Sequence, residues 1–139
     1  MKTYYAIGIK EYSQMNSQEL RENFLISNLF INDEFNIYYT HYDRNVIIGC
    51  KPVSKEIVIS DGKVFNQPYF LSRREMGIIN LGGTGRIEVD GQKFELAKTN
   101  ALYIPMGAKQ ISFSSITQND PALFYINCAP AHQGYQIKK

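Results

Sequence analysis

YFLSRREMGIINLGGTG, from Tyr69 to Gly85, carries the clearest structural signals in the chain. Its apolar residues form short runs that a charged cluster separates, and a glycine-rich segment ends it. Short apolar runs bounded by turn residues are typical of β-strands. We therefore expect two short strands and a turn here, with Tyr69, Leu71, Arg73 and Glu75 on one face if the first strand is unbroken.

The glycines of this stretch, Gly82, Gly83 and Gly85, invite comparison with phosphate-binding loops. A dinucleotide-binding loop requires a helix directly after it. Here the sequence RIEVDG follows at 86–91, and it has the alternation of a strand. We therefore interpret the glycines as a bend between two strands.

Short β-type runs separated by turns continue on both sides of this stretch. Asp90-Gly91 is a strong signal for a two-residue hairpin between RIEV and QKFEL. About ten candidate strands at even spacing fit a closed sandwich or barrel. The clearest of them lie at 35–42, 45–53, 55–60, 76–81, 86–89, 92–96, 101–104, 110–116 and 123–128.

The residues before the first of these strands are less regular. Asn16 or Ser17, followed by Glu19, has the pattern of a capping box, which predicts one short helix at about 17–25. Residues 1–15 contain tyrosines and isoleucines without a clear period. We interpret them as an edge strand or an arm.

The composition favours one β-rich domain and argues against two classes of partner. The chain has 139 residues, 44% of them hydrophobic, with 10 tyrosines and 8 phenylalanines, and aromatic residues favour strands. A net charge of +2 gives no electrostatic footprint for nucleic acid. No apolar run reaches the length of a membrane helix, and the first residues lack a signal-peptide core, so we expect a cytoplasmic protein that binds neither nucleic acid nor membranes. Cys50 and Cys128 are expected to be reduced and buried.

Two segments resemble the signatures of the cupin β-barrels. Glu75 and Gly82 have the spacing of the glutamate and glycine that end the first signature. The two histidines that should precede them are replaced by Tyr69 and Leu71, or by Pro68 and Phe70 if the longer spacing is used.

The second cupin signature shows the same loss of ligands. Pro105 and Gly107 fit its proline and glycine, but Gln110 stands at the histidine position. A transition-metal site needs about three ligands of the histidine or carboxylate type, and only Glu75 would remain. We expect an all-β, cupin-type double-stranded β-helix, or jelly-roll barrel, with one short N-terminal helix and no metal site.

Four separated segments together resemble the amino-terminal half of 5-keto-4-deoxyuronate isomerase. They are NIYYTHYDR at 36–44, the stretch at 69–91, ALYIPMGAK at 101–109 and FYINCAPAH at 124–132. The resemblance implies a two-cupin chain, in which an amino-terminal cupin without metal precedes a cupin that binds zinc through three histidines and a glutamate.

This resemblance implies a division of the chain and a place for the metal. Residues 1–34 would be an arm with the short helix, 35–130 a metal-less cupin barrel, and 131–139 the start of a linker to a second cupin. His41 and His132 are the only histidines, so the zinc ligands of the family have no counterpart here. Zinc is expected in the second cupin and no cofactor in this chain.

The activity implied by the resemblance is an aldose-ketose isomerisation. It interconverts 5-dehydro-4-deoxy-D-glucuronate and 3-deoxy-D-glycero-2,5-hexodiulosonate in the breakdown of pectin and other uronate polysaccharides. This chain alone is expected to be inactive. The alternative is a non-catalytic degenerate cupin that serves oligomer assembly or sugar-acid binding. A homo-oligomer is expected in either case, because exposed sheet edges favour association.

Three arginines are candidates for binding the carboxylate of a keto-uronate substrate. Arg73 or Arg74 could bind it directly through charge-assisted hydrogen bonds, and Arg44 lies in the segment YTHYDR. The alternative is a structural ion pair between Arg73 and Glu75 at the mouth of the barrel, which is the more common role of a buried arginine.

Candidate catalytic residues are His41, Asp43 and Glu75. His41 and Asp43 would share a face on strand alternation, which is the arrangement of a base and its orienting acid or of two metal ligands. A hydrogen-bonded network at a strand end is the more common outcome for such a pair. His132 follows an irregular stretch and is not expected to be catalytic.

Overall fold

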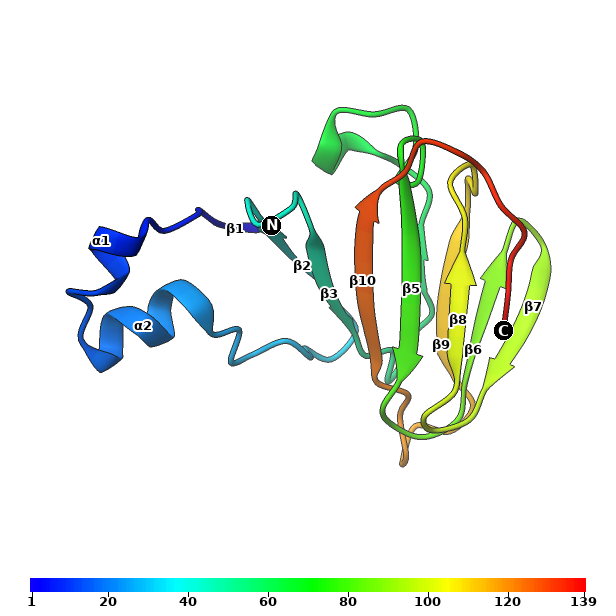
Figure 1. The fold of residues 1–139 in the computed structure, drawn as a ribbon. Coiled ribbons are helices and arrows are strands. Elements are labelled where there is room, and N and C mark those ends of the chain that lie inside the picture. Colours follow the sequence, from blue (N-terminus) through cyan, green and yellow to red (C-terminus); the bar gives the residue numbers. More distant parts are fainter.

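The protein consists of two β-sheets that face each other, with an arm of short helices projecting to one side (Figure 1). The computed structural model describes residues 1–139. The strands are β1 (Lys2–Tyr4), β2 (Phe35–Thr40), β3 (Val46–Cys50), β4 (Ile57–Ile59), β5 (Arg74–Asn80), β6 (Gly85–Val89), β7 (Gln92–Leu96), β8 (Ala101–Ile104), β9 (Ile111–Ser115) and β10 (Phe124–Pro130). The helices are α1 (Ile9–Tyr12), α2 (Ser17–Phe24) and the 3-10 turn η1 (Lys63–Phe65).

The connectivity confirms the expected cupin-type jelly roll. The first sheet has the order β1-β2-β3-β10-β5-β8 and the second the order β4-β9-β6-β7. All neighbours are antiparallel except β1 and β2. Sequence-distant strands therefore lie side by side, as β10 does between β3 and β5.

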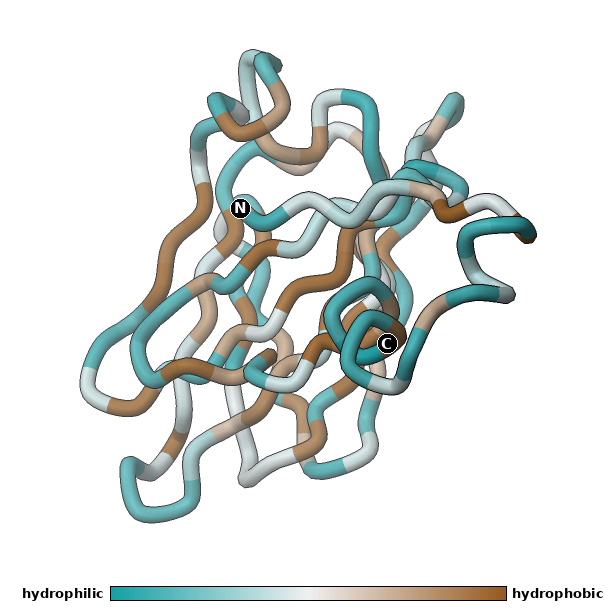
Figure 2. The backbone as a smooth tube through the Cα atoms, turned by 90° about the vertical axis from the view of Figure 1, so that its left-hand side faces the viewer, coloured by the Kyte–Doolittle hydropathy of each residue, from teal (hydrophilic) through white to brown (hydrophobic).

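The core lies between the two sheets, where alternate residues of each strand point inward. Phe113 of β9 is fully buried and its ring contacts Phe124 of β10 across the interior, with centroids 5.5 Å apart. Hydrophobic residues follow the strands, whereas many loop tips are hydrophilic (Figure 2). Cys50 and Cys128 belong to this core and are both free, as expected. No helix in the structure has the length and apolarity needed to cross a lipid bilayer.

The predicted hairpin and helix are both confirmed. Asp90 and Gly91 connect β6 to β7 with φ values of 48° and 89°, the left-handed backbone that a tight hairpin turn needs. Helix α2 begins after Asn16, whose side chain accepts hydrogen bonds from the backbone of Gln18 and Glu19. Glu19 accepts one from the Asn16 backbone in return, at 2.8 Å, which completes the capping box.

The prediction of a strand from Tyr69 to Arg73 is wrong. This segment forms turns, in which the backbone N–H of Ser72 donates to the Tyr69 carbonyl at 3.2 Å, and β5 begins only at Arg74. The charged cluster therefore starts the strand and does not interrupt it. The glycine-rich bend after β5 is confirmed, since β6 follows it directly.

The N-terminal arm differs from the expectation in having a second, four-residue helix, α1. β1 pairs in parallel with β2 at the edge of the six-stranded sheet, so residues 1–15 include both the edge strand and part of the arm. The returning chain crosses β3 at Gly49, where a Cβ atom would collide with the carbonyl oxygen of Leu29. Only glycine allows this close approach.

One end of the barrel is closed by a buried polar side chain. Asn80, at the end of β5, is fully buried and donates to the carbonyls of Gly83 and Leu96 at 2.7 and 2.8 Å. Its carbonyl oxygen accepts from the backbone N–H groups of Gly82 and Leu123. The side chain thus connects three loops and leaves none of its polar groups unpaired.

At the C-terminus, Lys138 exchanges two backbone hydrogen bonds with Tyr103 of β8, at 2.7 and 3.2 Å. The last residues thus lie along the free edge of the six-stranded sheet. Residues 131–139 therefore contact the barrel in this structure, and their role as a linker stays a prediction.

Candidate functional site

A pocket of about 920 Å³ lies at the opposite end of the barrel from Asn80, where β5 begins and β10 ends. Its walls come from β1, the end of β2 with the following turn, the segment 63–70 and the segment 130–132. Arg44, Arg73 and Arg74 all line this pocket. The structure therefore brings the three predicted substrate-binding residues together, although up to 30 positions separate them in sequence.

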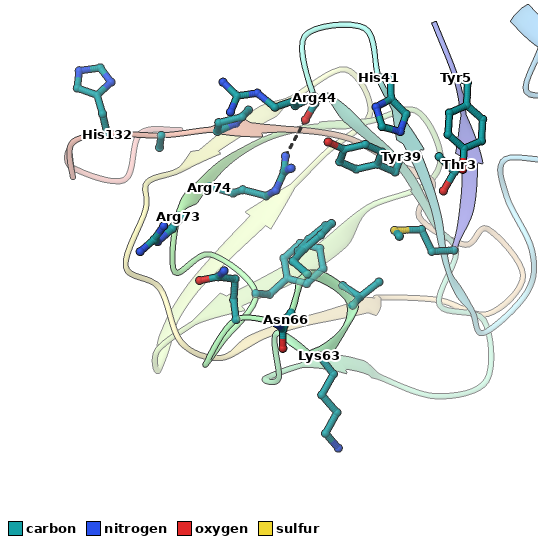
Figure 3. Close-up of a pocket in the computed structure, with 17 residues that line it drawn as sticks. Thr3, Tyr5, Tyr39, His41, Arg44, Lys63, Asn66, Arg73, Arg74 and His132 are labelled. Carbon is teal, nitrogen blue, oxygen red and sulfur yellow. Dashed lines mark hydrogen bonds between the residues drawn. The ribbon is translucent and has the colours of Figure 1, made fainter.

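Arg74 is the best-anchored of these arginines (Figure 3). Its guanidinium lies over the ring of Phe65 at 4.6 Å and beside that of Tyr39 at 5.7 Å, so aromatic faces hold the cation on two sides. Its Nη1 donates to the carbonyl oxygens of Arg44, at 2.9 Å, and Cys128, at 3.4 Å. A guanidinium has further N–H donors that these two bonds do not use.

Arg44 and Arg73 lack any anionic partner. Both side chains are exposed, and neither Asp nor Glu lines the pocket. The ion pairs of the chain lie elsewhere, on the hairpin of β6 and β7. The expected ion pair between Arg73 and Glu75 is therefore not formed.

Glu75 lies on the outer face of β5, because its neighbour Met76 is fully buried on the inner face. Its carboxylate accepts a hydrogen bond from the hydroxyl of Tyr103 at 2.7 Å. Desolvation, with the neighbouring Glu75 as a second cause, raises the pKa of Tyr103 to about 12. The expectation that Glu75 faces the barrel interior is wrong, because the strand begins later than predicted and the alternation counted from Tyr69 does not apply.

His41 and Asp43 do not form the predicted pair. β2 ends at Thr40, and Asp43 lies in the following turn with φ of 52°. His41 lines the pocket, whereas Asp43 lines a separate cavity beside Phe24 of the arm. Strand alternation therefore does not apply to these two residues, and their expected common face is wrong.

His41 is held by aromatic neighbours. Its ring stacks on Tyr5 with centroids 4.9 Å apart and an interplanar angle of 12°. Tyr39 meets it edge-on at 5.2 Å. Its backbone N–H donates to the Tyr4 carbonyl at 2.9 Å. Of the three catalytic candidates, only His41 faces the pocket.

The residues of this chain do not fit a zinc ion. His41 and His132 are the only histidines, both line the pocket, and no carboxylate accompanies them there. No group of three His, Cys, Asp or Glu side chains comes close enough to hold a metal ion. Gln110, at the position of the missing cupin histidine, is exposed and its backbone donates to Asp90.

The two buried thiols are not suited to act as nucleophiles or metal ligands in the pocket. Burial raises the pKa of Cys128 to about 12, against an opposing effect of Arg74, and burial also raises the pKa of Cys50 well above its usual range. Both therefore stay protonated at neutral pH, as expected for core thiols.

Several pocket residues lie outside the sequence-based candidates. Thr3 lies in the N-terminal edge strand and Tyr5 directly follows it, and Lys63, Phe65 and Asn66 come from the turn that includes η1. The dipeptide Asp61-Gly62 predicts a turn here, but only the folded chain shows that it borders the arginines. Lys63 points away from them, so it belongs to the rim (Figure 3).

Comparisons with known proteins identify relatives of the whole barrel. The chain is 47% identical over 128 residues to the 4-deoxy-L-threo-5-hexosulose-uronate ketol-isomerase of Yersinia enterocolitica. The aligned region covers 91% of this chain and 46% of the relative. It is 46% identical over 135 residues to the enzyme of the same name from Formosa agariphila, covering 97% and 48%. This chain is homologous to one half of these ketol-isomerases. It spans about half the length of the curated relatives that it matches.

Solved structures resemble this chain in fold alone. An HTH_3 family transcriptional regulator from Vibrio cholerae matches 69% of this chain and 51% of its own, with a TM-score of 0.53 and 16% identity. A cupin protein from Bacteroides fragilis matches 66% and 72%, with a TM-score of 0.48 and 22% identity. No family model matches the chain.

Proposed function

We propose that this chain is part of a ketol-isomerase that interconverts 5-dehydro-4-deoxy-D-glucuronate and 3-deoxy-D-glycero-2,5-hexodiulosonate. The observation that carries the proposal is the identity of 45 to 47% over about nine tenths of the chain to relatives named as such isomerases. The substrate would come from pectin or other uronate polysaccharides.

We assign the chain to the amino-terminal, metal-free half of the enzyme. Ketol isomerisation moves a proton between neighbouring carbons, and a metal that polarises the carbonyl assists this step. The side chains of this chain do not gather into a ligand set for zinc. Zinc would therefore be bound by residues that the relatives have beyond the matched half.

The residues of this chain are suited to binding an anion and less suited to moving its protons. Arg44, Arg73 and Arg74 can hold a carboxylate in the pocket. Asp43 and Glu75 lie outside it, and Glu75 is already paired with Tyr103. Of the three catalytic candidates only His41 lines the pocket, together with His132, and an imidazole can exchange a proton with a bound ligand.

Turnover by a chimera tests this proposal. This chain replaces the matching half of the Yersinia enterocolitica relative, and conversion of the ketouronate is followed by NMR. We expect a chimera that elutes and unfolds like the parent enzyme to turn over the substrate. A chimera that folds and assembles like the parent but is inactive would contradict the proposal.

The 139-residue chain by itself provides the matched control. We expect it to contain well under one zinc per chain by elemental analysis and to leave the ketouronate unconverted. Steady turnover or one zinc per chain would show that the catalytic set lies within these residues. That result would overturn the assignment to a metal-free half.

A second candidate function is a non-catalytic module that assembles an oligomer. The outer face of the six-stranded sheet favours it, because Ile79, Tyr103 and Tyr125 border a mostly apolar groove there. We propose a homo-oligomer on this ground. Light scattering of Ile79→Asp, with Val58→Asp on the exposed face of the other sheet as control, tests it. A wild-type monomer at micromolar concentration would contradict it.

We also propose a cytoplasmic location. The support for it is the similarity to bacterial enzymes that are named as uronate ketol-isomerases. Fractionation of cells that express the protein without added targeting signals would test this.

A further inference from the structure

The pocket concentrates positive charge that the chain itself does not neutralise. Three arginines line it, with Lys63 at its rim, and no aspartate or glutamate does. The three arginines alone exceed the net charge of the whole chain, which is +2. The remainder of the chain is therefore net acidic, so the pocket is not one part of a generally basic surface.

Gathering like charges at one opening is unfavourable unless an anion is bound there. The ion pairs elsewhere show that carboxylates were available to pair with cations: Arg86 contacts Glu95 at 3.9 Å, and Lys93 contacts Glu88 at 3.7 Å. The pocket arginines have no such partner. Arg74 is further fixed by two carbonyls and two aromatic rings, so its remaining donors are pre-organised for a ligand.

The remaining walls of the pocket are suited to a sugar ring. Phe65 is partly exposed and rests on the buried ring of Phe70, with centroids 5.0 Å apart, so its exposed part can pack against the C–H groups of a pyranose. Asn66 and Thr3 offer polar groups for hydroxyls. The amide nitrogen of Gln67 is also free, because that side chain uses only its oxygen, which accepts from Ser72.

We propose that this pocket is a binding site for a hydroxylated carboxylate of monosaccharide size, held by Arg44, Arg73 and Arg74 and in contact with the exposed part of Phe65. The chain has no group of three side chains that could hold a metal ion, so the arginines of the pocket would supply the charge that binds the carboxylate. The choice of a uronate as its ligand rests on the proposed function, whereas its anion selectivity rests on the pocket alone.

Calorimetric titration of the 139-residue chain with D-glucuronate, D-glucose and inorganic phosphate tests the proposal. We expect D-glucuronate to bind at least about tenfold more tightly than D-glucose, because the arginines recognise the carboxylate. Inorganic phosphate has no C–H face for Phe65, so we expect it to bind more weakly than the uronate. Higher ionic strength should weaken uronate binding.

Two variants and one control locate the site. Arg73→Gln and Arg44→Gln should each weaken D-glucuronate binding about tenfold, because each removes a charge-assisted hydrogen bond. Arg86→Gln removes an exposed arginine from the other sheet and should leave binding unchanged. Both pocket side chains are exposed, so the variants should fold.

Three results would overturn the inference. They are equal affinity for D-glucose and D-glucuronate, equal effects of Arg73→Gln and Arg86→Gln, and phosphate binding as tight as that of the uronate. None of these bears on turnover by the chimera. An active chimera whose pocket variants bind normally would refute the site and keep the isomerase, and an inactive chimera with a selective pocket would do the reverse.

Discussion

The two ends of the barrel differ in whether their polar side chains are paired within the protein. At the closed end, Asn80 is fully buried and both its amide and its carbonyl are hydrogen-bonded to loop backbone. At the open end, Arg44 and Arg73 are exposed without an anionic partner. β5 runs from one end to the other, from Arg74 to Asn80 (Figure 1).

This difference distinguishes polar side chains that stabilise the fold from polar side chains that are available to bind a ligand. A buried polar group contributes to stability when every donor and acceptor is paired within the protein. A group that keeps free donors at an opening contributes little to stability and is available to a ligand. Substitutions at the closed end should therefore lower stability, and those at the open end should lower binding.

Asn80→Leu should have the largest effect. It keeps the approximate volume but leaves the backbone groups of Gly83, Leu96, Gly82 and Leu123 without their partner. Each unpaired buried group costs about 1–3 kcal/mol, so for four groups we expect a loss of at least about 4 kcal/mol in the free energy of unfolding, measured by urea denaturation.

Asn127→Ala is the control for this substitution. Asn127 is exposed on β10 and its side chain makes no hydrogen bond within the protein, so its effect should stay within about 0.5 kcal/mol. A similar cost for both substitutions would remove the distinction between the closed end and the rest of the sheet.

Arg74→Ala should have the second largest effect, because Arg74 combines both roles. Its loss removes the cation over Phe65 and the bonds to two carbonyls, for which we expect about 1–3 kcal/mol of destabilisation in the same assay. Arg74→Lys should restore little of it, because an ammonium lacks the planar fork. Full recovery by lysine would mean that charge alone matters there.

Asp33 should produce a smaller effect that depends on pH. Its carboxylate accepts hydrogen bonds from the Ser54 hydroxyl and from the backbone of Val53 and Ser54, which hold the pKa of Asp33 well below its usual range. Stabilisation from a depressed pKa is present above the unfolded value of about 4 and is lost as pH falls below it. Asp33→Asn should lower stability at pH 7.

The pH profile checks this assignment, since Asp33→Asn should also flatten the fall in stability between about pH 4 and pH 2. Asparagine tolerates the left-handed backbone of residue 33, where φ is 59°. Asp61→Asn is the matched control, because Asp61 accepts one hydrogen bond, from the Lys63 backbone. Parallel profiles for Asp33→Asn and the wild type would contradict the role of the carboxylate.

Arg73→Gln should have the smallest effect on stability, within about 0.5 kcal/mol, because Arg73 is exposed and unpaired. The ligand response should reveal its role. Excess D-glucuronate raises the melting temperature of a protein that binds it only when folded, so the wild type should show this rise and the variant should lose most of it. Calorimetric scans with and without the uronate would measure both quantities.

The strands could be predicted from the sequence because their signals are local. Alternation and turn dipeptides such as Asp90-Gly91 depend on neighbouring residues, and the capping box at Asn16 spans one helical turn. These features were correct to within a few residues. The exception was the start of β5, where the turn at Ser72 reversed the side on which Glu75 lies.

The candidate site was predicted only in part, because it is assembled from distant segments. The arginines near positions 44 and 74 stood out by their charge. Nothing local shows that Tyr5 would stack on His41, since β1 reaches the pocket by pairing in parallel with β2. Glu75 failed as a candidate because a motif match gives spacing in sequence and not the direction of a side chain.

Met1 lines the open pocket together with Thr3 and Tyr5, which has a practical consequence for any purification strategy. An affinity tag fused before Met1 would emerge at the opening and could crowd the arginines, and a polyhistidine tag would add imidazoles beside His41. A tag after Lys139 would avoid this opening. Elemental analysis and titrations should therefore use protein with a cleaved or carboxyl-terminal tag.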